Sequence, residues 1–349
     1  DPLEVIDKYG ADALRMTLMT GNAPGNDMRF YWERVEASRN FANKVWNASR
    51  FIMMNIEKAP VTDVKLSDLQ MADRWILSKV NTLAKDVTEN MDKYELGIAL
   101  QKVYDFIWEE FCDWYIEMVK PRLWSEEDTT KAAALWTLKT VLIQSLKLLH
   151  PYMPFVTEEI YSKLVPEEES LMMSDWPVYE EEWNFPVDEN IVDHYKEIIR
   201  GIRNVRAEMN VPNSRKATAF VVCEDEELGA GLALLGHAAQ NMAALNELVI
   251  QKDKSGIADD AVSIVVPDAT VYLPLEELID FEQEIERLTK EEARLTKEIA
   301  RSNGMLNNEK FVSKAPAAKV QEEREKLETY QQMMAQVKER LEGLKAKQS

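Results

Sequence analysis

Cysteine, histidine, glycine and proline are scarce in this sequence. Its 349 residues include 2 cysteines, 3 histidines, 11 glycines and 13 prolines. Two distant cysteines, Cys112 and Cys223, exclude a disulfide-rich secreted domain and favour a reducing compartment. The histidines, His150, His194 and His237, stand singly, without another ligand at metal-site spacing. We therefore expect no metal site, and the few glycines and prolines favour helices over an all-β fold.

Long apolar runs and catalytic motifs are also missing. The sequence contains no apolar leader and no run of about 18 apolar residues, so we expect a soluble, cytoplasmic protein without a membrane partner. It has no glycine-rich phosphate loop, no G-x-S-x-G and no H-E-x-x-H. The many carboxylates are then expected on solvated helix faces. Because the chain starts at Asp1, we expect a piece of a longer protein.

Hydrophobic residues make up 46% of the chain and charged residues 30%, which is enough for several packed cores. The length exceeds one ordinary domain. We predict a mainly α protein with four parts: an N-terminal piece, an antiparallel helix bundle, a small α/β module and an antiparallel coiled-coil hairpin. Their expected bounds are 1–31, 32–165, 166–274 and 275–349.

The N-terminal half is expected to be helical. Residues 1–31 contain two short helical segments, about 1–10 and 11–20, and a short strand is expected at 28–31. Apolar periodicity then predicts longer helices at 33–57, 68–92, 95–119, 129–150 and 154–164. A capping box at Ser67–Gln70 and stops at Pro121 and Pro151 fit these bounds. Short connections between long helices indicate an antiparallel bundle.

The third part, residues 166–274, mixes helical and β-rich patterns. An acidic, proline-punctuated stretch is followed by a predicted helix at 188–209. Runs rich in β-branched residues predict strands at 217–223 and 262–266, with helical patterning between them. This alternation is typical of a small α/β module.

The last part shows heptad spacing. One arm carries Phe281, Ile285, Leu288, Leu295, Ile299 and Leu306, and the seam is interrupted at Glu292 and Ser302. The return arm carries Leu327, Tyr330, Met334, Val337, Leu341 and Leu344. An antiparallel coiled coil fits this pattern. Each arm of about 28 residues would reach roughly 40 Å.

The net charge is −20, although polyanion binding calls for a positive surface. The acidic residues are unevenly distributed, since twelve of them lie between Glu158 and Asp193 beside a single basic residue, Lys163. Two other stretches are locally basic. Nucleic acid would therefore be confined to those two surfaces.

The first basic surface lies on the predicted helix at 33–57. At 100° per residue the core face carries Val35, Ala42, Val45, Trp46, Ile52, Met53 and Ile56. The opposite stripe carries Asn40, Lys44, Asn47 and Phe51, flanked by Arg34, Arg39 and Arg50. An aromatic ring, amides and cations are the groups that bind unstacked bases. The alternative is that Phe51 packs on a neighbouring helix and the asparagines are only solvated.

The second basic surface is the predicted tip of the coiled coil. Between Ala293 and Val320 the basic residues are Arg294, Lys297, Arg301, Lys310, Lys314 and Lys319. Only Glu298 and Glu309 oppose them. A positive patch on an acidic chain favours a polyanionic partner. The alternative is the ordinary surface charge of a coiled coil.

Four segments resemble one enzyme family. They are DPLEVIDKYGADALR at 1–15, NFANKVWNASRF at 40–51, LHPYMPFVTEEI at 149–160 and LNNEKFVSKAP at 306–316. The first resembles the segment that follows the lysine-rich ATP-binding loop of class I aminoacyl-tRNA synthetases. The second and third resemble the valyl, isoleucyl and leucyl subgroup of that class. The fourth is similar to the tip of the C-terminal arm of valyl-tRNA synthetases.

The resemblance implies a tRNA-binding role. Residues 1–31 would link a catalytic core to the bundle, the bundle would read the anticodon, and the arm would lean on the outer corner of tRNA(Val). Lys44 and Phe51 match helix positions near the anticodon site. The full-length enzyme would use ATP with Mg²⁺ to attach valine. This piece lacks the catalytic and editing domains and should not aminoacylate. It would bind no cofactor. Its partner, besides the tRNA, would be the enzyme's own N-terminal catalytic domain, and it would act as a monomer.

Two alternatives remain at this point. One keeps the synthetase class but changes the amino acid, giving an isoleucyl or leucyl enzyme. The other is a helical protein-interaction scaffold, in which the hairpin docks other helices and no RNA takes part. Exposed apolar residues at the tip, such as Phe311 and Val312, would favour the scaffold.

Overall fold

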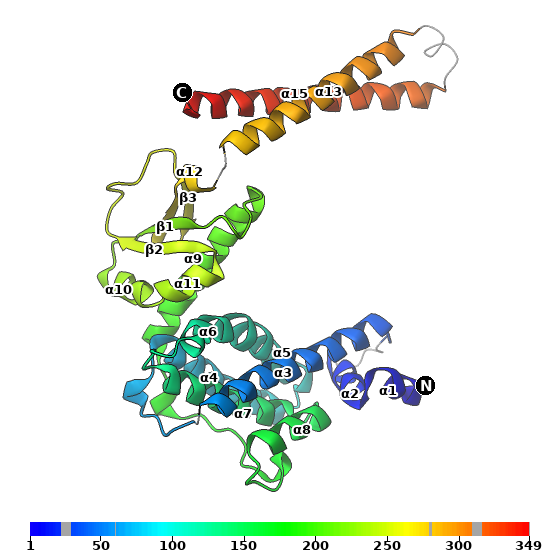
Figure 1. Ribbon diagram of the computed structural model, residues 1–349. Helices are drawn as coiled ribbons and strands as arrows, with labels where there is room; N and C mark the ends of the chain where they lie inside the picture. Colours follow the sequence, from blue (N-terminus) through cyan, green and yellow to red (C-terminus); the bar gives the residue numbers. More distant parts are fainter. Residues whose placement is uncertain (22–28, 60, 279–280, 309–315, 349) are drawn as a thin grey trace. The chain divides into compact units, whose positions relative to one another are not determined.

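The computed structural model describes residues 1–21, 29–59, 61–278, 281–308 and 316–348 (Figure 1). The chain divides into two compact units. The first comprises Asp1–Val205, Thr218–Ile257 and Ser263–Tyr272, and the second comprises Arg206–Ala217, Ala258–Val262 and Leu273–Ser349. The mainly helical fold that the sequence predicts is confirmed.

Two short helices open the chain, α1 (Pro2–Tyr9) and α2 (Ala11–Met19). The Asp1 carboxylate accepts from the Leu3 backbone N–H at 2.9 Å, and Gly10 with φ of +89° separates the two helices. The strand predicted at 28–31 is wrong for residues 29–31, which are irregular, while Met28 lies outside the described residues. An isolated strand gains no ladder of hydrogen bonds. Tyr31 is instead the N-cap residue of the next helix.

The five predicted bundle helices are confirmed. They are α3 (Trp32–Lys58), α4 (Met71–Asp92), the continuous segment of α5 (Leu96–Asp105), η2 (Phe106–Tyr115) and α6 (Ile116–Trp124), then α7 (Lys131–Leu149) and α8 (Pro154–Leu164). The middle of the third, η2, is π-helical. Such a segment is rare over this length and changes the face that the helix presents after it.

Two predicted helix boundaries are corrected. Pro121 does not stop the helix, because it lies in the last turn of α6, where Ser125 N–H still bonds to its carbonyl at 3.2 Å. The capping box lies three residues later than predicted, after the short turn η1 (Leu66–Asp68). Gln70 N–H donates to the Asp73 carboxylate at 2.9 Å, which fixes the start of α4.

Helix α7 lies at the centre of the bundle and packs on α3, α4, α5, α6 and α8. It is long and apolar enough to cross a membrane by length and composition, but 61% of that window is buried inside the protein. Burial against five helices accounts for its apolar surface. Large side chains complete the core, and Trp75, Phe41 and Tyr115 are each fully buried.

The α/β module contains a four-stranded sheet in the order β2-β1-β4-β3. After the turns η3 (Leu171–Met173) and η4 (Glu181–Trp183), its elements are α9 (Pro186–Glu208), β1 (Ala217–Val222), α10 (Glu226–Leu234), α11 (Gly236–Met242), β2 (Leu245–Gln251), β3 (Val262–Val266) and β4 (Ala269–Leu273). Strands β1 and β4 run antiparallel, with Phe220 opposite Tyr272. Strands β1 and β3 match the prediction.

Strands β2 and β4 were not predicted. Two consecutive residues of β2, Asn246 and Glu247, are exposed, so its sequence does not alternate cleanly. Strand β4 follows β3 after only Pro267 and Asp268, and Asp268 has φ of +56°. Such a tight turn hides the boundary between two strands in a single β-rich run.

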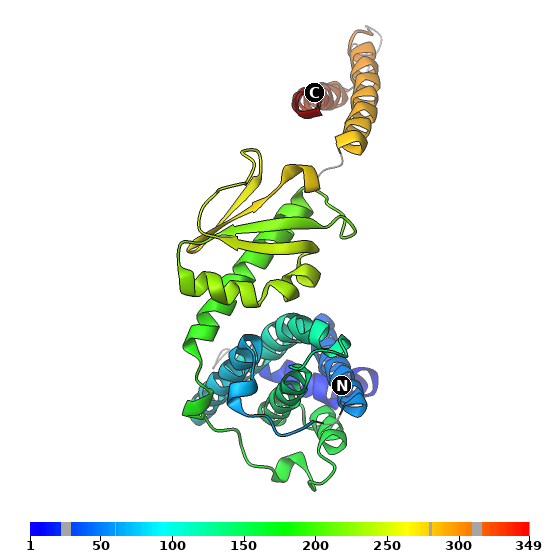
Figure 2. The same ribbon diagram turned by 60° about the vertical axis from the view of Figure 1, so that its left-hand side comes forward.

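Helix α9 lies against the sheet (Figure 2), and the two approach closely at Gly201. A Cβ atom at Gly201 would lie 2.7 Å from the Cγ2 atom of Ile264 on β3. Helix α10 approaches α9 in the same way, since a Cβ atom at Gly231 would lie 2.6 Å from the Ile191 side chain. At both glycines the missing Cβ atom leaves room for an isoleucine side chain, which any larger residue would displace.

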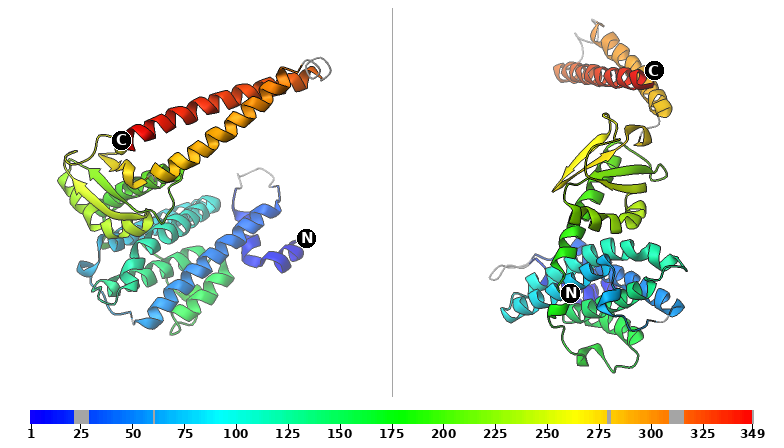
Figure 3. Two further views of the ribbon diagram at one scale, coloured as in Figure 1. Left: turned by 45° about the horizontal axis from the view of Figure 1, so that its top comes forward. Right: turned by 90° about the vertical axis from the view of Figure 1, so that its left-hand side faces the viewer.

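The arm follows α12 (Leu275–Leu278) and consists of α13 (Phe281–Leu306) and α15 (Ala317–Gln348). The two long helices lie side by side and antiparallel, as Figure 3 shows. Ile285 and Leu288 pack against Val337 and Leu341, as the heptad spacing predicts. At the predicted interruption, the buried Ser302 hydroxyl donates to the Glu323 carboxylate at 2.7 Å. This polar pair joins the two helices at one register.

Candidate nucleic-acid interface

Helix α3 carries the predicted stripe, and its buried face differs partly from the prediction. The buried residues are Val35, Ser38, Phe41, Val45, Ser49 and Ile52. Ala42, Trp46, Met53 and Ile56, predicted for the core, are only half-buried. The buried face is rotated by roughly 30° from the predicted one at 100° per residue. On the buried face, Phe41 packs against Tyr104, with the two rings tilted and their centroids 4.6 Å apart.

The four stripe residues lie on the side of α3 that faces away from its core. Asn40 and Asn47 are exposed, and Lys44 and Phe51 are half-buried. Helical spacing places all four along one line. The Phe51 ring is half-buried, so part of it packs on the bundle and part faces solvent, and base binding by this ring stays a prediction.

Lys44 is held by neighbours on η2. Its ammonium donates to the Asp113 carboxylate at 2.6 Å and lies 3.9 Å from the centre of the Trp108 ring. An ammonium over an indole ring is attracted by the ring's negative face. The side chain is thereby fixed in place, and its charge is partly compensated.

The flanking arginines differ in how they are held. Arg39 donates to Glu36 at 3.2 Å and to the Asn40 side chain at 3.3 Å, and its guanidinium lies 5.3 Å from the Tyr9 ring. Its Nε atom is buried and has no hydrogen-bond partner among the described residues. Arg50 is exposed. The cations around the stripe thus include both anchored and solvent-facing groups.

Past Phe51, the C-terminal end of α3 borders a hollow of about 360 Å³, which we name the Trp124 hollow. It is lined by Phe51, Met54, Asn55, Lys58, Leu123, Trp124, Glu126 and Lys131. Among these residues only Phe51 was predicted as a site residue from the sequence. The available signal for the others was a tryptophan at a helix end, directly before the polar loop Ser125–Thr130.

A buried ion pair holds the helix end that carries Trp124. The Arg122 guanidinium donates to both oxygens of Asp73 at 2.8 and 2.9 Å, and the fully buried Tyr115 hydroxyl donates to Asp73 at 2.7 Å. Arg122 also donates to the Thr130 hydroxyl and carbonyl, each at 2.8 Å. Bidentate pairs of this kind are geometrically specific. The loop beside the hollow is therefore fixed at both ends.

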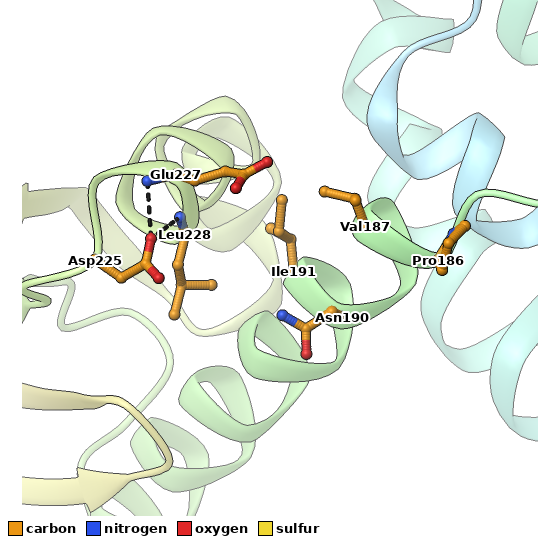
Figure 4. A pocket seen from close by; sticks show the side chains of 7 residues that line it. All are labelled: Pro186, Val187, Asn190, Ile191, Asp225, Glu227 and Leu228. Carbon is orange, nitrogen blue, oxygen red and sulfur yellow. Dashed lines mark hydrogen bonds between the residues drawn. The ribbon is translucent and has the colours of Figure 1, made fainter.

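A second hollow, in the α/β module, is lined by acidic rather than basic side chains (Figure 4). It is lined by Pro186, Val187, Asn190, Ile191, Asp225, Glu227 and Leu228. The Asp225 carboxylate accepts from the backbone N–H groups of Glu227 and Leu228, each at 2.9 Å, so the start of α10 is already capped. With two carboxylates and no cation among these seven lining residues, the hollow is unsuited to a phosphate.

The described tip cations of the arm are exposed, and two of them, Arg294 and Arg301, are paired on their own helix. Arg294 donates to Glu291 at 2.6 and 2.9 Å, and Arg301 lies 3.1 Å from Glu298. Lys297 and Lys319 are exposed. The remaining predicted tip residues, Lys310 and Lys314, lie outside the described residues, as do Phe311 and Val312.

Neither cysteine is placed for nucleophilic chemistry. Burial raises the pKa of the Cys112 thiol to about 12, and burial also raises the pKa of Cys223. A thiolate is the reactive form, so both thiols are unreactive at neutral pH. Within the described ranges, no three or more His, Cys, Asp or Glu residues gather in a way that would hold a metal ion.

Comparison with known families defines the class of protein first. Residues 73–221 match the family described as the anticodon-binding domain of tRNA ligase, and residues 280–345 match the valyl tRNA synthetase tRNA binding arm. The chain is therefore a tRNA-binding region of an aminoacyl-tRNA synthetase. The first match begins at Asp73 and leaves α3 outside it.

Curated relatives identify the family. The valine–tRNA ligase of Clostridium perfringens is 51% identical over 345 residues, covering 99% of this chain and 39% of that protein. The enzyme of Clostridium acetobutylicum is 49% identical over 346 residues, with the same coverage. The chain belongs to the valyl-tRNA synthetases, as the region with their anticodon-binding domain and tRNA-binding arm. It spans about two fifths of the length of these relatives.

Proposed function

We propose that this chain is the part of a valyl-tRNA synthetase that recognises tRNA(Val) for the attachment of valine. The main support for this proposal is that one chain matches both an anticodon-binding domain and a valyl-type tRNA-binding arm. The full-length enzyme would use ATP with Mg²⁺, and its own N-terminal catalytic domain would be the partner of residues 1–31. The 349 residues alone would not aminoacylate. We expect a cytoplasmic monomer.

The bundle, residues 32–165, would read the anticodon through the stripe on α3. Phe51 offers a ring on which a base can stack, and Asn40 and Asn47 offer exposed amides for base edges. Lys44, Arg39 and Arg50 supply the charge that holds the backbone of the loop. Anchoring of Lys44 by Asp113 and Trp108 supports this role, because a fixed cation loses less freedom on binding.

The arm, residues 275–349, would contact the outer corner of the tRNA. Its candidate contacts are Arg294, Lys297, Arg301, Lys310, Lys314 and Lys319. A long two-helix lever with a basic tip supports this assignment, since its length lets it reach RNA that a compact domain would not. The α/β module, 166–274, lies between these two parts along the chain and would present an acidic stretch that nucleic acid avoids.

Capture of RNA tests the proposal most directly. The chain is incubated with total tRNA, retained RNA is recovered by filter binding, and the RNA is sequenced. We expect enrichment of tRNA(Val), with a further loss of affinity when its anticodon is exchanged. Equal retention of all tRNAs would remove the anticodon-reading role. No retention at moderate salt, together with self-association, would favour the protein-interaction scaffold.

Replacement of the stripe ring tests the role of the bundle. Phe51→Ala should weaken binding of tRNA(Val) by about 1–3 kcal/mol if a base stacks there. Phe51→Tyr keeps the ring and should retain most of the affinity. An unchanged affinity of Phe51→Ala at fixed salt would remove the stripe from the interface.

Charge reversal tests the role of the arm. Lys297→Glu combined with Lys319→Glu should weaken binding and flatten its salt dependence, by a slope of about 0.9 for each phosphate that is no longer neutralised. Lys252→Glu, in the α/β module, is the control and should leave the slope as it is. An unaltered slope in the arm variant would mean that these two lysines do not contact phosphate.

A further inference from the structure

The Trp124 hollow continues the α3 stripe toward the end of the helix. Phe51 belongs to both, and Met54 and Lys58 follow it at spacings of three and four residues. From Asn40 to Lys58 the helix rises by roughly 27 Å at 1.5 Å per residue. A single-stranded chain lying along the stripe would therefore reach the hollow without leaving α3.

The walls of the hollow expose apolar side chains to solvent. The Trp124 side chain is 64% exposed and Met54 is 50% exposed. Covering this apolar surface with a ligand would be favourable. The indole ring is the largest flat surface that a protein can offer, and its face suits stacking with a base. Leu123, the residue before it, is buried and holds the helix end against the bundle.

Polar groups of the hollow suit a nucleotide. The Asn55 amide donates to the Phe51 carbonyl at 2.7 Å, which fixes the plane of the amide. Lys58 and Lys131 border the hollow, and Glu126 is its single carboxylate. Lys120 lies 5.8 Å from the centre of the Phe51 ring and is paired with Glu117 at 2.6 Å, which compensates its charge. The two lining lysines against one lining glutamate favour an anionic ligand over an acidic or neutral peptide.

The hollow is also held rigid before any ligand binds. The bidentate Arg122–Asp73 pair ties α6 to α4, and Arg122 ties α6 to Thr130 at the start of α7. Asp128 accepts from the Thr130 backbone N–H at 2.7 Å and closes the loop. A preorganised site loses little freedom when its ligand binds. Its volume of about 360 Å³ lies at the small end of ligand sites.

We propose that the Trp124 hollow binds one unstacked base of single-stranded RNA, with the Trp124 indole as the stacking surface. The proposal rests on the proposed function, and it adds a second base-binding position beyond Phe51. Lys58 and Lys131 hold the phosphates that flank this base, and the Asn55 amide contacts its edge.

Substitution of the indole tests the proposal in the full chain. Trp124→Ala should weaken binding of tRNA(Val) roughly 5- to 150-fold, the range for loss of one stacked base. Trp124→Phe should recover most of that loss. Phe155→Ala is the matched control, because Phe155 is equally exposed at 64% but lies on α8. Thermal unfolding of each variant verifies that the fold is kept, and Met54→Glu provides a second route that leaves Trp124 in place.

Transcripts lacking single bases identify the ligand. A series of tRNA(Val) transcripts, each with one abasic position in the anticodon loop, is bound to the wild type and to Trp124→Ala. We expect one position whose removal weakens the wild type but not the variant. If Trp124→Ala and Met54→Glu keep full affinity while Phe51→Ala loses it, the hollow is not used and the proposed function still stands.

If all three variants bind tRNA(Val) as the wild type does, neither the hollow nor the stripe contacts the RNA, and anticodon reading through α3 fails as well. If Trp124→Ala changes only the sedimentation of the protein, the hollow is a protein contact and the proposal is overturned. The three results are distinguishable because RNA affinity and oligomeric state are measured separately.

Discussion

The described ion pairs of the arm all join residues of one helix, whereas the bundle has local pairs, such as Arg39 with Glu36, and also pairs between helices. In the bundle, Lys44 reaches Asp113 on another helix and Arg122 reaches Asp73, 49 positions away. In the arm, Arg294 and Arg301 each pair with a glutamate three residues earlier on the same helix. Cross-helix contacts fix a charge in one place, whereas exposed local pairs exchange easily with solvent. A surface that binds individual bases needs cations fixed by cross-helix contacts. A surface that binds phosphates can use cations that are held only in local pairs.

Buried polar groups show the same contrast. Asp73 has no exposed surface and accepts from Arg122, Tyr115 and the Gln70 backbone. The arm has one described counterpart, the buried pair of Ser302 and Glu323. Several donors satisfy the bundle carboxylate, while among the described residues a single hydroxyl donates to the arm carboxylate. Substitutions in the two regions should therefore differ in their effects.

Removal of the Asp73 charge should have the largest effect. Asp73→Asn leaves the Arg122 guanidinium mostly buried without its anion, and should lower the free energy of unfolding by about 3–5 kcal/mol. Urea denaturation measures the change. Asp86→Asn is the control, since its pair with Lys102 is well exposed and should contribute less than about 1 kcal/mol. Equal losses in the two variants would contradict the contrast between buried and exposed pairs.

Loss of the Ser302 hydroxyl should have an intermediate effect confined to the arm. Ser302→Ala leaves the buried Glu323 carboxylate without this donor, and should destabilise the arm by about 1–3 kcal/mol. Amide hydrogen exchange in α13 and α15 should become faster, while exchange in α7 should not change. Replacing both residues by leucine should restore protection, because it gives a continuous apolar seam. If exchange stays slow in Ser302→Ala, the pair does not fix the register.

A change of pH should have a smaller effect on stability, confined to the unit that contains His194 and Asp268. Burial opposes the charge on His194, but the Asn190 carbonyl at 2.8 Å and Asp268 at 3.1 Å outweigh it and raise the pKa. The resulting stability is fully present below the unfolded pKa of about 6.5 and is lost as pH rises through the raised folded value. Urea midpoints from pH 5.5 to 8.5 should therefore fall more in the wild type than in His194→Gln. The arm contains no histidine, so its helix content should stay constant.

The smallest effect should come from the exposed pairs of the arm. Glu291→Gln removes the partner of Arg294 on the same helix face, and we expect no measurable change in hydrogen exchange of α13. It should raise RNA affinity slightly at low salt, because one anion near the proposed phosphate contacts is removed. A loss of protection as large as that of Ser302→Ala would mean that the local pairs of the arm are structural.

Much of the fold was predictable because its signals are local. The bounds of α8, 154–164, and of β3, 262–266, match the prediction at both ends. Pro154 at the first helical position and a β-branched run are signals that neighbouring residues supply. Strand β2 was missed because its exposed Asn246 and Glu247 obscure alternation, and the sheet stabilises it only through a strand distant in sequence.

The candidate site was predictable only in part. Helical spacing aligns the stripe residues, and the structure agrees that Asn40 and Asn47 face away from the core of α3. Spacing could not show that Phe41 turns inward to pack against Tyr104, or that Lys44 lies over Trp108. The position of Trp108 depends on η2, whose π-helical turns place the ring where an α-helix would not.

The sequence by itself determined the helical periodicity, the heptad seam of the arm, the separation of acidic and basic stretches, and the segments that match a synthetase. Each of these depends on residues that are close along the chain. Only the tertiary structure decided that Met54, Trp124 and Lys131 border one hollow, and that Asp73 holds the helix end beside it. Met54 and Asp73 lie on α3 and α4, far along the chain from Trp124, so their proximity to it follows from how the helices pack rather than from any local pattern.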